Sequence, residues 1–139
     1  MKNRNENMKS KINWILKNLH LIVSLSIVFP TAIIYGSPSI LPEHLDIQVN
    51  TIDLSNMLKA IMCLYLGISL VWIMGIWKTE YWKFATKLNI LFMISLAIGR
   101  TLSMLIDGLP TAGYIFGIIA EFTLGFYSIY QLKKYSRYE

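Results

Sequence analysis

The chain has 139 residues, of which 55% are hydrophobic and 15% are charged, and its mean hydropathy is +0.49. A soluble protein of this size needs a polar surface around its core, and 13 basic and 8 acidic residues gathered mostly near segment ends do not supply one. The composition therefore excludes an ordinary soluble enzyme or binding domain and indicates a membrane protein. The net charge of +5 is interpreted first as contact with a membrane surface.

Four apolar stretches stand out, each near the roughly 20 residues that cross a bilayer core. None of them shows the period-two alternation of a membrane strand, so only helices would satisfy their backbone groups in lipid. The sequence therefore predicts an all-α integral membrane protein, a four-helix up-and-down bundle that forms a single domain over residues 1–139. The predicted helices are residues 12–35, 54–77, 84–106 and 112–132.

The links between the predicted helices differ in length. Residues 78–83 and 107–111 form short links, so the second, third and fourth helices are predicted to be antiparallel neighbours. The first link, residues 36–53, contains Pro38 and Pro42 and is long enough to fold over one mouth of the bundle.

Basic residues are strongly biased toward one side of the predicted bundle. Lys and Arg in short flanking segments are retained in the cytoplasm, whereas the first and third links contain acidic residues and no cation. Both the N-terminus and the C-terminus are therefore predicted to be cytoplasmic. The cations on that side are Lys2, Arg4, Lys9, Lys11, Lys17, Lys78, Lys83, Lys87, Lys133, Lys134 and Arg137.

The first apolar segment also has features of a cleaved signal peptide. It has a basic start, an apolar run over residues 21–35 and small residues at Gly36 and Ser37. However, Lys17 and His20 interrupt the run, and cleavage would leave three helices with termini on opposite sides. We therefore expect a retained helix.

Metal, redox and nucleic-acid chemistry have little support in the sequence. Cys63 is the single cysteine and lies inside the second helix, so no internal disulfide can form. His20 and His44 fall on opposite sides of the predicted membrane; His44 with Glu43 and Asp46 makes only a weak surface metal site. The basic tails suit anionic lipid headgroups better than nucleic acid. We expect no cofactor and no metal.

Ionisable residues inside the spans carry the functional signal. Lys59, Arg100 and Glu121 lie in the predicted outer half of the membrane, about 7, 9 and 13 Å from the outer helix ends. An ionised group in hydrocarbon is costly and normally faces a partner or a wet cavity, so we predict an ion pair between Arg100 and Glu121. Ser103 and Asp107 follow Arg100 on the same helix side, and these five residues are the candidate ligand-binding set.

Small residues recur four positions apart in three of the predicted helices. Such stripes let helices approach closely, so charges that lie on them are predicted to face protein rather than lipid. This argument predicts that Lys59 and Glu121 point inward. The stripes are Lys59, Cys63, Gly67, Val71 and Gly75; Ser95, Gly99 and Ser103; and Gly113, Gly117, Glu121 and Gly125.

These charges admit two interpretations. The first is a buried salt bridge that only fixes helix register. The second is a polar pocket open to the outer face, favoured because two cations and one carboxylate at similar depth leave a surplus positive charge. Asp107 weakens the second interpretation, because it could pair with Arg100 and bring the group to neutrality.

The residues around Arg100 resemble a known family. Residues 99–110, GRTLSMLIDGLP, followed by Glu121 and Gly125, resemble the bacterial membrane family catalogued as domain of unknown function 4345, and residues 59–67, KAIMCLYLG, are similar to its second-helix motif. The resemblance covers about residues 15–133. It implies a four-helix multi-pass protein of the bacterial inner membrane with its first helix retained, and it implies no established activity.

Two positions depart from the family pattern. The family prefers Arg where this chain has Lys59 and Gly where it has Cys63. Lysine keeps the charge but lacks the planar fork of arginine, so two-point contact of Lys59 with a carboxylate or phosphate is in doubt. Cysteine is small enough to preserve a close helix contact.

The sequence is compatible with three functions. The first is a binding or accessory protein whose outer pocket, formed by the candidate set and Tyr65, holds a small polar ligand or a lipid headgroup. The second is an enzyme that uses Glu121 as an acid or base on a lipid-like substrate, although no nucleophile–base set or phosphate loop is present. The third is a structural or assembly subunit, with homo-oligomer contacts through the small stripes. A transporter is disfavoured because paired broken helices are lacking.

Overall fold

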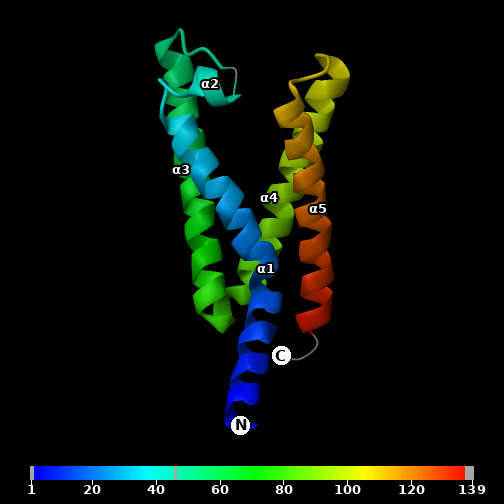
Figure 1. The fold of residues 1–139 in the computed structure, drawn as a ribbon. Helices are drawn as coiled ribbons and strands as arrows, with labels where there is room; N and C mark the ends of the chain where they lie inside the picture. Colours follow the sequence, from blue (N-terminus) through cyan, green and yellow to red (C-terminus); the bar gives the residue numbers. More distant parts are fainter. Residues whose placement is uncertain (1, 46, 137–139) are drawn as a thin grey trace.

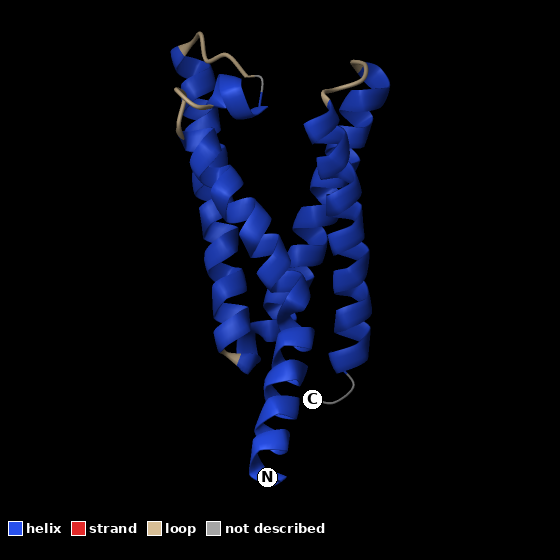
Figure 2. Ribbon diagram, in the orientation of Figure 1, coloured by secondary structure: helices blue, strands red, loops and turns tan. Residues whose placement is uncertain are grey.

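The protein is described by a computed structural model that covers the backbone of residues 2–45 and 47–136 and the side chains of residues 8–43 and 47–136. These residues form helices and loops, without any strand (Figure 2). The side chains of Lys2, Arg4, His44, Asp46 and Arg137, which entered the predictions above, lie outside this description. The helices are α1 (Lys2–Gly36), α2 (Leu41–Leu45), α3 (Ile52–Trp77), α4 (Thr79–Ile106) and α5 (Ala112–Tyr135) (Figure 1).

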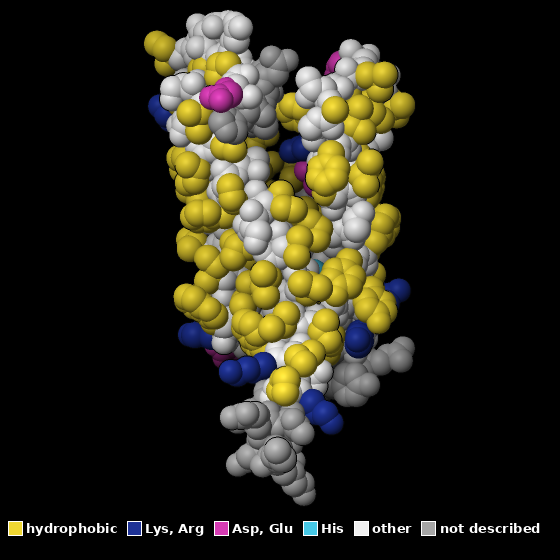
Figure 3. Space-filling model, in the orientation of Figure 1, with side chains coloured by type: hydrophobic (Ala, Val, Ile, Leu, Met, Phe, Trp, Pro, Cys, Tyr) yellow, Lys and Arg dark blue, Asp and Glu magenta, His cyan; other side chains and the backbone are white. Residues whose placement is uncertain are grey.

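Four of these helices are long and apolar enough to span a membrane. The candidate spans are Met8–Gly36, Ile52–Trp77, Thr79–Ile106 and Ala112–Tyr135. Large apolar side chains cover much of the outer surface, as expected for a protein that contacts lipid (Figure 3). The predicted all-helical membrane fold is therefore confirmed.

Two helices start well before their predicted positions. The first helix begins at Lys2 instead of residue 12, and α4 begins at Thr79 instead of residue 84, which leaves Lys78 alone between α3 and α4. The predicted limits followed hydropathy, but polarity does not end a helix. Residues 2–11 and 79–83 contain neither Gly nor Pro, so nothing in their sequence breaks the helix.

The bundle consists of two helix pairs. The most extensive contacts join α1 to α3 and α4 to α5, and α3 also packs on α4, whereas α1 contacts α5 far less. We call the end that carries α2 and residues 107–111 the loop end, and the opposite end, near both termini, the terminal end. The two pairs meet toward the terminal end and diverge toward the loop end (Figure 1).

An aromatic cluster from α1, α3 and α4 ties the two pairs together. Tyr35 of α1 packs edge-on against Tyr65 of α3, with 5.6 Å between ring centroids. Phe92 of α4 makes the same kind of contact with Tyr65 and with Trp72, at 5.0 and 5.6 Å. Edge-to-face contacts at these distances are favourable, so the cluster holds α3 against α4.

Candidate functional site

An ion pair joins α4 to α5 on the inner side of the bundle. Arg100 Nη1 lies 3.3 Å from Glu121 Oε1, and Glu121 is only 8% exposed. The guanidinium also lies 5.5 Å from the ring centroid of Tyr114 and contacts the Tyr65 side chain of α3. A Cβ atom at Gly117 would lie 2.7 Å from Arg100 Nη1, so this glycine leaves the space that the guanidinium needs. The structure therefore contains the predicted pair, with three neighbours that fix its position.

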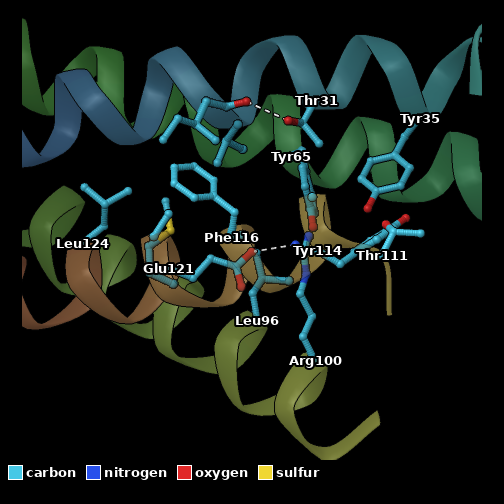
Figure 4. A pocket seen from close by; sticks show the side chains of 16 residues that line it. Thr31, Tyr35, Tyr65, Leu96, Arg100, Thr111, Tyr114, Phe116, Glu121 and Leu124 are labelled. Atoms are coloured by element: carbon cyan, nitrogen blue, oxygen red, sulfur yellow. Dashed lines mark hydrogen bonds and ion pairs between the residues drawn. The ribbon is translucent and has the colours of Figure 1, made fainter. Parts of the chain in front are cut away.

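The ion pair lines a cavity of about 340 Å³ between the two helix pairs, which we call the loop-end cavity. Such a volume lies within the roughly 300–1,000 Å³ of small-molecule sites. Basic and acidic atoms are visible in the hollow between the pairs (Figure 3), and the close-up shows the cavity walls (Figure 4). All four long helices contribute to the lining, which includes Val28, Tyr65, Met93, Arg100, Glu121 and Leu124.

One oxygen of the buried carboxylate has no partner. Glu121 Oε1 contacts Arg100, whereas Glu121 Oε2 makes no hydrogen bond within the described residues. A buried carboxylate oxygen without a donor is costly, and the apolar side chains around it offer no compensation. Glu121 lines the cavity, but this oxygen is itself buried, so the carboxylate must turn toward the cavity to accept a hydrogen bond from a molecule inside it.

The comparison with known proteins concerns nearly the whole chain. Residues 15–132 match the family described as "Domain of unknown function (DUF4345)". The chain belongs to this family. No curated protein and no solved structure matches it. The membership agrees with the resemblance of residues 99–110, and the family description names no activity.

Ser103 and Asp107 of this DUF4345 protein form a hydrogen-bonded turn at the loop end. Ser103 Oγ donates to Asp107 Oδ2 at 2.8 Å, and the Asp107 amide donates to the Ser103 carbonyl at 2.7 Å. Gly108 follows with a φ of +108°, a backbone conformation that favours glycine. Ser103 also lines a smaller cavity, about 270 Å³, on another side of Arg100, whereas Asp107 lines neither cavity. Ser103 and the Asp-Gly-x-Pro motif of residues 107–110 thus shape the end of α4.

Lys59 is not part of the site in the DUF4345 chain. Its side chain is exposed and lines neither cavity, so the expectation that it faces inward is wrong. Small size permits close packing but does not require it: of the α3 stripe only Gly75 is buried, and larger side chains such as Tyr65 and Trp72 occupy much of the inward face. The buried positions of this helix are Leu58, Tyr65, Ser69, Trp72 and Gly75.

The small stripe of α4 also faces outward. Ser95, Gly99 and Ser103 are exposed, and a Cβ atom at Gly99 would meet nothing within 4 Å. Only the α5 stripe is used as predicted along most of its length, since Gly117 approaches Arg100 and Gly125 approaches Ile94.

A second polar group, missed by the sequence reasoning, lies toward the terminal end of the DUF4345 bundle. His20 Nε2 lies 3.0 Å from Thr86 Oγ1, and Asn89 Nδ2 donates to Ser128 Oγ at 2.8 Å. All four residues are fully buried. We call His20, Ser24, Ser69, Thr86, Asn89 and Ser128 the terminal-end polar layer. Its signal in the sequence was the spacing of polar residues by three or four along otherwise apolar spans, on α1 and α4.

The polar layer lies one helical turn from the floor of the loop-end cavity. Val28 and Leu124, which line the cavity, are four residues from Ser24 and Ser128 on their helices. The hydroxyl oxygens of Ser24 and Ser69 and the Asn89 carbonyl oxygen have no hydrogen-bond partner among the described residues. The polar layer and the ion pair are thus two separate polar levels with apolar side chains between them.

Proposed function

We propose that this protein is a membrane-embedded binding or accessory protein that holds the polar head of a membrane-dissolved ligand in the loop-end cavity. The observation that supports this most is the buried Glu121 with one unpartnered carboxylate oxygen, next to Arg100, in a cavity walled mainly by apolar side chains. Intramembrane ionisable residues normally mark a pathway, a relay or a ligand site. Two charges at one end of an apolar cavity favour a ligand site.

The distribution of cations supports a loop end in the outer half of a bacterial cytoplasmic membrane, with both termini cytoplasmic. Lys78, Lys83, Lys133 and Lys134 lie at or near the helix ends of the terminal side, where basic atoms gather (Figure 3). Positive residues in short flanking segments are retained in the cytoplasm. In this orientation the cavity is reached from the outer leaflet.

A purely structural role for the ion pair is the second candidate. Arg100 and Glu121 join α4 to α5, and such a pair can fix the register of two helices without any ligand. The two candidates differ in what an exchange of the charges would do. An Arg100→Glu/Glu121→Arg double variant should restore a register contact, but it would place both groups differently in the cavity and lose a ligand.

The deciding experiment is native mass spectrometry of the protein released gently from membranes. We expect a defined small-molecule adduct on the wild type that is lost in Glu121→Gln and in Arg100→Leu. Lys59→Gln is the matched control, because it removes an intramembrane charge outside the cavity and should keep the adduct. Glu121→Gln conserves side-chain size, so it covers the case in which Arg100→Leu fails to fold.

Two results would count against a binding role. One is a wild-type protein without any adduct. The other is an adduct that all variants retain, since that molecule would be bound elsewhere. If the charge-exchanged protein instead matched the wild type in folding, abundance and adduct, the pair would be structural.

A further inference from the structure

The charge balance of the loop-end cavity restricts the ligand that it can hold. Among the described residues that line it, only Arg100 and Glu121 are charged, and they face each other. An anionic head would have to draw Arg100 away and leave the Glu121 carboxylate buried beside a second negative charge. A cationic head would isolate Arg100 in the same way. An uncharged head leaves the pair intact, so burial of unpaired charge is avoided.

The unused hydrogen-bonding capacity of the pair specifies the head further. Glu121 Oε2 lacks a donor, and it can only accept while the carboxylate is ionised. The Arg100 guanidinium has five N–H groups, and its contacts with Glu121 and Tyr65 do not use all of them. Because Oε2 has almost no accessible surface, the Glu121 carboxylate must turn toward the cavity to accept from a hydroxyl or amide donor of the head. An oxygen acceptor next to that donor would then take an N–H of Arg100.

The walls and the opening of the cavity indicate an apolar tail. Ile27 of α1 and Phe116 of α5 line the cavity and are 46% and 72% exposed, so both also face the lipid. Among the described residues, α1 and α5 are joined by a hydrogen bond toward the terminal end, where Gln131 Nε2 donates to the Leu16 carbonyl at 2.8 Å. Beyond that point the two helices diverge (Figure 1), and the space-filling view shows a hollow between the two helix pairs, from which the cavity opens sideways (Figure 3).

We infer that the ligand is an uncharged amphiphile, with a hydroxyl or amide donor beside an oxygen acceptor in its head, and that its tail leaves between α1 and α5. This inference rests on the proposed function and names the chemical class for the same site. The head would contact the Glu121 carboxylate and Arg100, and the first part of the tail would lie against Val28, Met93 and Leu124.

The test compares two probes that share one oleoyl chain: monooleoylglycerol, with an uncharged hydroxyl head, and oleoyl lysophosphatidic acid, with an anionic one. Each is titrated into purified, delipidated full-length protein and followed by native mass spectrometry. We expect the wild type to prefer monooleoylglycerol by about tenfold or more in dissociation constant. Glu121→Gln should reverse the preference, because it leaves Arg100 as an unpaired cation in the cavity.

Lys59→Gln again serves as the control and should keep the wild-type preference, and thermal unfolding of each variant checks its fold. A wild type that prefers the lysophosphatidic acid would overturn the uncharged head. So would a native adduct that depends on Glu121 but is not displaced by monooleoylglycerol, although the binding function would then stand. If the wild type carries no adduct and binds neither probe, the proposed function fails together with the inference.

Discussion

The glycines of α5 share one spacing but have different neighbours. Gly113 has open space around it, Gly117 lies against the tip of Arg100, and Gly125 lies against Ile94. A methyl group at the last position would lie 2.5 and 2.8 Å from two carbon atoms of Ile94. Alanine at Gly113 therefore tests a position that faces solvent or lipid. Alanine at Gly117 tests the ion pair, and alanine at Gly125 tests the contact between α4 and α5.

We predict three different results for alanine at these positions. Gly125→Ala should lower the free energy of unfolding by about 1–3 kcal/mol through overpacking of α4 on α5. Gly113→Ala should leave it unchanged or raise it by up to about 1 kcal/mol through helix propensity. Gly117→Ala should displace the Arg100 guanidinium and reduce ligand occupancy with little effect on stability.

Reversible unfolding in mixed micelles and native mass spectrometry would measure the two quantities on the same samples. Equal stability of Gly113→Ala and Gly125→Ala would contradict the close contact between α4 and α5. Full occupancy in Gly117→Ala would show that the position of the guanidinium is not important for binding.

The chemistry of single residues was enough to predict the Arg100–Glu121 pair, because two opposite charges at similar depth in apolar helices stabilise each other. It was not enough to predict the direction of the Lys59 side chain. Its direction depends on which face of α3 packs, and bulky residues such as Tyr65 and Trp72 decide that face through the area they bury. Spacing by four identifies a helix face but not the partner of that face.

At the scale of elements, the terminal-end polar layer includes a contact between α1 and α4, two helices that otherwise have few contacts. The His20 contact with Thr86 joins α1 to α4, and the Asn89 bond to Ser128 joins α4 to α5. Because the two helix pairs separate toward the loop end, the His20–Thr86 contact acts where the pairs are closest. It should therefore help to hold the pairs together.

We predict that Thr86→Val, which removes the hydroxyl at nearly constant volume, lowers the free energy of unfolding by about 0.6–1.7 kcal/mol, from the average to the maximum for hydrogen bonds between membrane helices. Thr123→Val is the control, because Thr123 is exposed on α5 and bonds only to the Ile119 carbonyl of its own helix. The measurement is equilibrium unfolding in mixed micelles. Identical values for the two variants would argue against a link between α1 and α4 through His20.

Element type and order followed from length and hydropathy, because a span of apolar residues in lipid has few alternatives to a helix. The helix ends and the short helix α2 could not be predicted in this way, because they depend on local geometry. At the start of α3, for example, the Thr51 side chain accepts a hydrogen bond from the Leu54 amide at 3.1 Å. The polar layer was missed because single Ser, Thr and Asn residues in a span carry no charge to draw attention to them.

For the whole molecule, the arrangement of the spans makes orientation a measurable property. An even number of spans places both ends of the described chain on one side. We predict that side to be cytoplasmic, because Lys and Arg near the helix ends gather there.

The measurement uses a Cys63→Ser background with single cysteines placed at Ser39 or Ser136, both exposed and at opposite ends. A membrane-impermeant maleimide should label Ser39→Cys in intact cells and Ser136→Cys only after lysis. The reverse pattern would place the loop end in the cytoplasm and the cavity in the inner leaflet.

The sideways opening between α1 and α5 changes how occupancy of the cavity would be controlled. An amphiphile that enters from the bilayer is already concentrated and oriented there, so its mole fraction in the leaflet, rather than its level in water, sets how often the cavity is filled. A modest intrinsic affinity would then be enough to fill the cavity. Occupancy of the cavity would follow membrane composition, because it would rise and fall with the abundance of one lipid class.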